Sequence, residues 1–118
     1  MAVTLNKRAF DFAKKLIADG HRELDENGDW SDHQPSADQE NKFLEKHDFA
    51  EYAKWHLGED DEHPEDTKGR YKFPYGDFKK VHRCGVIAAK ARAAQRDHDD
   101  IEDAAARLLD KLDKLMEK

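Results

Sequence analysis

From residue 70 to residue 80 the sequence reads RYKFPYGDFKK, and aromatic side chains alternate there with basic ones. A proline disfavours the helical conformation in the residue before it, and the run Pro74-Tyr75-Gly76 is typical of a turn. We therefore predict that residues 71–81 form one extended or hairpin-like aromatic segment. The remaining chain must then supply the elements against which this segment packs.

Outside this segment the sequence favours helices. Apolar residues at helical spacing predict a helix over residues 5–19, and Gly20 is suited to the left-handed position that ends it. Ser36 and Gln39 have the spacing of a capping box and predict the start of a second helix. Further helices are expected over residues 49–57, 84–95 and 100–116. The sequence thus predicts an all-α fold of four to five short helices, with the aromatic segment packed across them.

The length of 118 residues is that of a single domain. Polar, turn-forming residues predict a loop at about 21–35. Residues 59–69 are rich in acids and have no large apolar side chain, which predicts an acidic linker and makes this segment the candidate for mobility. We expect one small helical domain over residues 1–118.

Charge is distributed very unevenly along the chain. Residues 68–96 contain nine lysines or arginines and one acid, a net charge of +8. The remainder has 12 basic and 26 acidic residues, a net charge of −14, so the whole chain has −6. Lysine and arginine bind phosphates, and aromatic rings stack on unpaired bases. The candidate contacts for nucleic acid or another polyanion are Arg70, Tyr71, Lys72, Tyr75, Lys79, Lys80, Arg83, Arg92 and Arg96.

The same pattern has other interpretations. In one, the aromatic rings belong to the core and the bases face the protein's own acids at 59–66 and 97–103; in another, the bases bind an acidic protein. The leucines at 108, 112 and 115 form a heptad-like seam near the C-terminus. With the alanine-rich helix, this seam suits a protein–protein interaction or phage-related assembly module, as a monomer or weak homodimer.

Catalytic and metal-binding motifs are absent from the sequence. There is no CxxC or HExxH pattern, no glycine-rich phosphate loop and no serine elbow. Asp25, Asn27 and Asp29 are spaced like the start of an EF-hand loop, but the glycine and glutamate of that motif are missing. Cys84 at a helix start, with His82 nearby, suits a reactive thiol. We predict a non-enzymatic protein with no cofactor and no metal, and keep a small Cys84-dependent enzyme as the least favoured alternative.

The expected location is the cytoplasm. The single cysteine excludes an intramolecular disulfide, which favours a reducing compartment. No apolar run approaches the ~20 residues of a membrane span. We therefore expect a soluble cytoplasmic protein with no membrane contact.

Three blocks of the sequence form a pattern. They read YAKWHLG at 52–58, YKFPYGDF followed by VHR at 71–83, and DIE with AA and LL at 100–109. In these blocks the chain resembles a family of small stand-alone bacterial proteins with no assigned function. A looser similarity, at residues 71–74, 86–95 and 100–101, is to a C-terminal segment of some phage-associated proteins, including prohead-protease-like ones. Neither resemblance implies catalytic residues.

Overall fold

The computed structural model describes residues 3–25 and 28–116, and it contains strands as well as helices. Strands β1 (Val3–Leu5), β3 (His56–Asp60) and β4 (Tyr71–Pro74) form an antiparallel sheet in the order β1-β3-β4. Strands β2 (Arg22–Glu23) and β5 (Val81–His82) form a parallel pair. The fold is therefore mixed α/β, and the prediction of an all-α fold was wrong.

Six α-helices and one short 3-10 helix are found in the described residues. Their bounds are α1 Lys7–Ala18, α2 Trp30–His33, α3 Ala37–Lys46, α4 Phe49–Ala53, η1 Lys68–Arg70, α5 Arg83–Gln95 and α6 Asp99–Met116. The predicted start at Ser36 is confirmed, because both hydrogen bonds of its capping box with Gln39 are present. Gly20 has a φ of 89°, so the predicted left-handed end of α1 is also confirmed. Within the described residues, every helix is too short or too polar to cross a bilayer.

The helix predicted over residues 49–57 is interrupted, and the sheet depends on this interruption. Helix α4 ends at Ala53, and the chain enters β3 at His56. The side-chain amide of Asn6 donates hydrogen bonds to the carbonyl oxygens of Ala53, at 2.9 Å, and His56, at 3.2 Å. A side chain about 50 positions away thus binds carbonyls at the point where the helix gives way to the strand. The sequence of residues 49–57 does not predict this contact.

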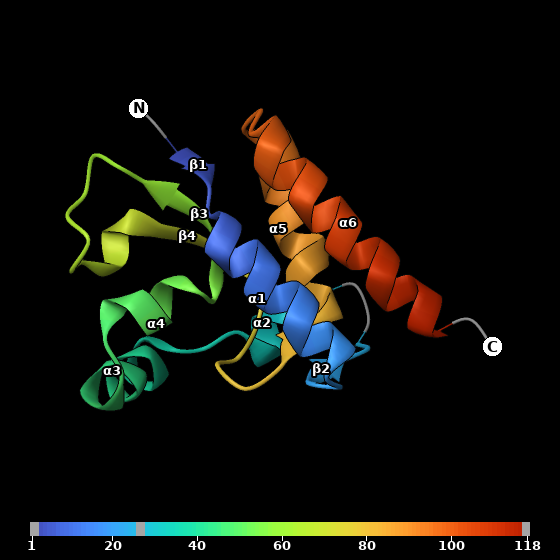
Figure 1. Ribbon diagram of the computed structural model, residues 1–118, viewed down its shortest axis with the longest axis horizontal. Helices are drawn as coiled ribbons and strands as arrows, with labels where there is room; N and C mark the ends of the chain where they lie inside the picture. The colour runs from blue at the N-terminus through green and yellow to red at the C-terminus, as the bar shows by residue number, and fades with distance from the viewer. Residues whose placement is uncertain (1–2, 26–27, 117–118) are drawn as a thin grey trace.

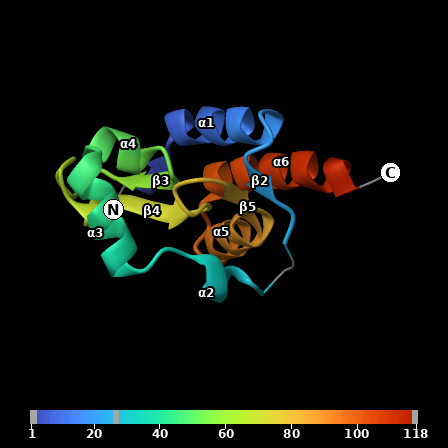
Figure 2. The ribbon, with the colours of Figure 1, turned by 90° about the horizontal axis from the view of Figure 1, so that it is seen from below.

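The elements are arranged around the long helix α6. Helices α5 and α6 pack side by side, and both contact the three-stranded sheet (Figure 1). Seen from below, α1 and α5 lie on opposite sides of α6, while α3 and α4 lie at the end of the molecule away from the C-terminus (Figure 2). The contact between α5 and α6 is close because small residues fill it: Ala89, Ala93, Ala104 and Ala105 are buried.

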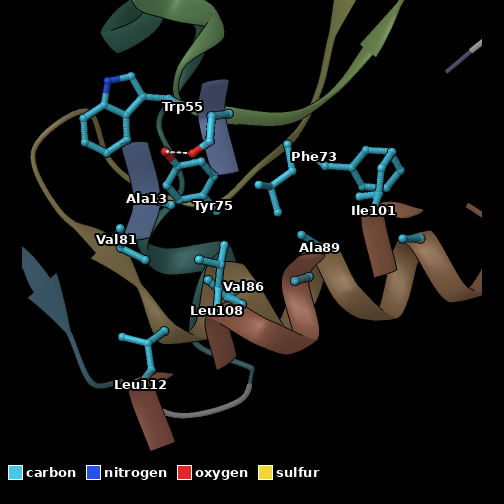
Figure 3. Packing of buried hydrophobic residues seen from close by; sticks show 14 of the residues in the cluster. Ala13, Trp55, Phe73, Tyr75, Val81, Val86, Ala89, Ile101, Leu108 and Leu112 are labelled. Atoms are coloured by element: carbon cyan, nitrogen blue, oxygen red, sulfur yellow. Dashed lines mark hydrogen bonds between the residues drawn. The ribbon is translucent and has the colours of Figure 1, made fainter. Parts of the chain in front are cut away.

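Tyr75, Val86 and Leu108 lie at the centre of the core and are fully buried (Figure 3). Around them pack the side chains of Leu57, Val81, Ile101 and Leu112, each with no exposed surface. The hydroxyl of Tyr75 donates to the carbonyl oxygen of Lys54 at 2.5 Å, so its polar atom is satisfied inside the core.

Residues 59–69 join two strands of the sheet. Glu59 and Asp60 complete β3, and η1 leads into β4. The turn between them is held by two hydrogen bonds to its backbone: Arg70 donates to the carbonyl oxygen of His63 at 2.9 Å, and the Tyr71 hydroxyl donates to that of Glu65 at 2.6 Å. The mobility expected of this segment stays a prediction.

Candidate polyanion-binding groove

The predicted contact residues are divided between the core, internal pairs and the surface. Tyr71 and Tyr75 belong to the core: 8% of Tyr71 and none of Tyr75 is exposed. Neither ring can therefore stack on a base. Their burial agrees with the interpretation that the aromatic rings of this segment belong to the core, because alternate side chains of the strand point inward.

Several of the basic residues contact groups of the protein itself. Nε of Arg83 lies 2.7 Å from an Asp113 carboxylate oxygen, and Nζ of Lys80 lies 4.0 Å from a Glu23 carboxylate oxygen. Arg70 is bound to the turn that precedes it. Lys79 is exposed, but it lines a separate hollow with Lys42, beside α3. These four residues do not form one surface.

The three remaining bases meet at a single hollow of about 240 Å³. Lys72 reaches it from β4, and Arg92 and Arg96 reach it from the end of α5. Arg92 and Arg96 are exposed and lie four positions apart, so they share one face of the helix. In residues 3–25 and 28–116, none of these three side chains has a hydrogen-bond or ion-pair partner. The remaining lining residues are Val3, Asp60, Phe73 and His98.

A second hollow, of about 220 Å³, adjoins the first and is largely apolar. It is lined by Trp30 of α2 and by Ala88 and Ala89 of α5. Its other lining residues are Ser31, Gln34, Phe73, Pro74 and Arg92. Phe73 and Arg92 line both hollows, so the two are neighbours; we call them together the groove, with the Trp30 hollow as its apolar end and the Lys72 hollow as its basic end.

Phe73 stands where the two halves of the groove meet, and its backbone is strained. Its φ of 61° lies in the left-handed region, which costs a non-glycine residue roughly 1–2 kcal/mol. The ring packs edge-on against His98, with centroids 5.8 Å apart. A Cβ at position 58 would lie 2.7 Å from Cδ2 of Phe73, so Gly58 makes room for the ring. Phe78 and Asp97 also have positive φ, at 69° and 59°, so this strain is not particular to the groove.

Sequence reasoning identified the three basic residues of the groove and missed Trp30. Lys72, Arg92 and Arg96 were found because they belong to the basic tract. Trp30 was missed because it lies in the predicted loop 21–35, far from the tract. The one usable signal was Gly85: a Cβ there would lie 2.9 Å from Cζ3 of Trp30, so a glycine lets the indole approach α5.

The arrangement of Cys84 and His82 does not suit a reactive thiol. Burial, with a hydrogen bond to Asp25, raises the pKa of Cys84 to about 12, so the thiol is protonated at neutral pH. Both ring nitrogens of His82 already face carboxylates, Nδ1 that of Asp25 at 2.7 Å and Nε2 that of Asp77 at 2.9 Å. The histidine therefore has no free nitrogen with which to take a proton from the thiol.

The proposed interaction surfaces of the two C-terminal helices are mostly buried. Leu108 and Leu112 have no exposed surface, whereas Leu115 is 38% exposed. On α5, Ala89 and Ala93 are buried. Most of the leucine seam therefore packs inside the protein.

The chain matches no protein-family model, no curated protein and no solved structure. The resemblance to the small bacterial family and the looser one to phage-associated proteins stay predictions. The geometry of the groove is therefore the basis on which a function can be assigned.

Proposed function

We propose that this protein is a non-enzymatic binding module that takes up a polyanion, most specifically single-stranded nucleic acid, in the groove between α2, β4 and α5. One observation carries the proposal: Lys72, Arg92 and Arg96 converge, without partners among the described residues, on the basic end of a groove. Unpaired cations at one hollow are the arrangement that binds phosphate groups.

The apolar end of the groove favours a single strand over a duplex. Trp30 provides an aromatic face beside the small side chains of Ala88 and Ala89. A base can stack on such a face only when it is unpaired, as in single strands. Each hollow is smaller than the roughly 300–1,000 Å³ of a drug-sized site, so each accommodates one group, a base or a phosphate.

The acidic charge of the protein limits the length of nucleic acid that the groove contacts. The chain has a net charge of −6, and one acid, Asp60, lines the basic end of the groove itself. This excess of acids repels a phosphate backbone beyond the groove. For a single strand, each phosphate contact contributes about −0.7 to the slope of log affinity against log salt concentration. We therefore expect three contacts to give a slope of about −2.

Charge reversal tests the proposal directly. The variant Arg92→Glu/Arg96→Glu removes two of the three cations, so we expect affinity for a short single-stranded oligonucleotide to fall about tenfold or more, with a salt slope smaller by about 1.4. Fluorescence anisotropy at low and moderate salt measures both. In a Trp55→Phe background Trp30 is the single tryptophan, and quenching of its fluorescence by the oligonucleotide reports whether a base reaches the apolar end.

The matched control is Lys79→Glu/Lys80→Glu. Each reversal subtracts two charges, so both double variants change the net charge from −6 to −10. Equal weakening in the two variants would mean that only net charge matters and would contradict the groove. An absence of binding by the wild-type protein at low salt would also contradict it. The cytoplasmic location stays a prediction beside this proposal.

A further inference from the structure

A buried polar cluster lies beneath the first turn of α5, outside the groove. Asp25, His82 and Cys84 each present one ligand atom, and these atoms lie within 4.8 Å of one another. The side chains of Asp25 and His82 are 9% and 6% exposed, and Cys84 is 1% exposed. The predicted absence of a metal site rested on spacing in the sequence, and Asp25 and His82 are 57 positions apart.

The donor atoms are those that zinc prefers. Zn²⁺ binds carboxylate oxygen, imidazole nitrogen and thiolate sulfur at about 2.0–2.3 Å in a tetrahedral arrangement. Neighbouring donor atoms are then roughly 3–4 Å apart. An Asp25 oxygen and Nδ1 of His82 are 2.7 Å apart, a separation bridged by one proton. A zinc ion replaces that proton once the pair separates by roughly 0.5–1 Å.

The outer contacts of His82 match those of a zinc-binding histidine. Such a histidine donates its second N–H to a carboxylate, which fixes the ring and its tautomer. Here Nε2 of His82 lies 2.9 Å from an Asp77 oxygen. The other Asp77 oxygen accepts the backbone N–H groups of Lys79, at 3.0 Å, and Lys80, at 2.8 Å. Asp77 is thus held in place, and Nδ1, which faces Asp25, is the nitrogen that would bind the metal in place of its shared proton.

Charge and coordination number also fit. The Asp25 carboxylate and the Cys84 thiolate together balance a divalent cation. Arg83 lies between His82 and Cys84 in sequence, but its side chain extends to Asp113. His33 of α2 stacks on His82 with ring centroids 5.0 Å apart, and its Nε2 is 3.9 Å from an Asp25 oxygen. His33 lies beside the three-residue cluster rather than in it, so it provides a fourth ligand only after its ring moves toward the ion.

We propose that Asp25, His82 and Cys84 form a zinc site, completed by His33 and oriented by Asp77. The ligands come from the segment after β2, from α2, from β5 and from α5. A bound ion would therefore tie Asp25 and His33 to the start of α5. The proposal does not depend on nucleic-acid binding, since its ligands lie outside the groove.

Cobalt and zinc titrations of the full chain, purified in chelator, test this site. Tetrahedral Co²⁺ with a thiolate ligand gives visible d–d bands and a near-ultraviolet charge-transfer band. We expect both bands at one equivalent, their displacement by Zn²⁺, and a higher melting temperature with Zn²⁺. An unchanged spectrum and melting temperature in a large excess of metal would overturn the proposal.

Variants assign the ligands. Cys84→Ser should abolish the charge-transfer band, and Cys84→Ala serves as a second version whose folding is checked by circular dichroism. Asp77→Asn should keep the band but weaken zinc affinity roughly 10–100-fold. His63→Ala is the matched control, because His63 also faces a carboxylate, Asp60 at 3.8 Å, but lies outside the cluster. Retention of the charge-transfer band without Cys84, or equal weakening by His63→Ala, would overturn the assignment.

Discussion

Single buried polar residues determine where the chain changes from one element to the next. Asn6 is 5% exposed, and its side chain hydrogen-bonds to two parts of the fold. Its side-chain oxygen accepts the N–H of Ala9 and caps α1, while its amide nitrogen binds Ala53 and His56 at the start of β3. One amide thus connects the N-terminal helix to the centre of the sheet.

His56 is buried beside two tyrosine rings, and we expect it to make stability depend on pH. Burial lowers its pKa to about 4, although its Nδ1 lies 2.9 Å from the Tyr52 carbonyl oxygen. The aromatic neighbours Tyr52 and Tyr71 stay neutral in acid, because the pKa of a tyrosine is near 10 and burial raises it further for both. Between about pH 6.5 and 4 the unfolded chain therefore binds a proton that the folded chain does not.

The free energy of unfolding should accordingly decrease as the pH falls through this range, by about 3 kcal/mol in total from this group. Urea denaturation at several pH values measures the decrease. In His56→Asn, whose amide nitrogen replaces Nδ1 but does not titrate, the decrease should be smaller by that amount. The same pH dependence in both proteins would show that His56 titrates normally when folded.

Helix α5 is recognisable by its small residues rather than by one apolar face. Gly85 admits Trp30 on one side, and Ala89 and Ala93 are buried. Its C-terminal end carries Arg92 and Arg96 to the groove. The end of this helix therefore determines where the two cations lie.

Helix α5 is followed by a residue in the left-handed conformation. Asp97 has a φ of 59°, and the N–H groups of Asp97 and His98 donate to the carbonyl oxygens of Ala94 and Ala93. This is the Schellman arrangement, in which glycine is favoured at the left-handed position. Asp97→Gly should raise the free energy of unfolding by roughly 0.5–1 kcal/mol, measured by thermal or urea denaturation.

A matched control for this prediction is Asp103→Gly, in the interior of α6. Asp103 is exposed and helical, so its replacement by glycine should destabilise by about 0.5–1 kcal/mol. Destabilisation of similar size by both substitutions would contradict the account of the α5 end.

Across the whole molecule, helix α6 links the sheet, α1 and α5. Its apolar seam lies mostly inside: Leu112 has no exposed surface, whereas Leu115 is 38% exposed. We therefore expect Leu112→Ala to destabilise the protein by about 2–5 kcal/mol and Leu115→Ala by less than about 1 kcal/mol. Urea denaturation measures both.

The same pair of variants distinguishes a folded monomer from a helix-paired dimer. In a dimer built on the seam, Leu115→Ala would be as costly as Leu112→Ala, and the unfolding midpoint would rise with protein concentration. Analytical ultracentrifugation over the same concentrations provides the direct comparison.

Features that depend on neighbouring residues were predictable from the sequence. The capping box at Ser36, the glycine at the end of α1 and the helical spacing of Ile101, Leu108 and Leu112 were all predictable, because each signal lies within a few positions. The concentration of positive charge at 68–96 was equally evident and identified three cations of the groove.

The sheet, the groove and the buried cluster depend on contacts between distant segments. Leu5 pairs with Gly58, Trp30 meets α5 at Gly85, and Asp25 reaches His82 across 57 positions. A strand of three to five residues carries little pattern of its own, and its hydrogen-bond partners come from distant segments. Ligand atoms likewise become a site only when folding brings them within a few ångströms, which no spacing along this chain records.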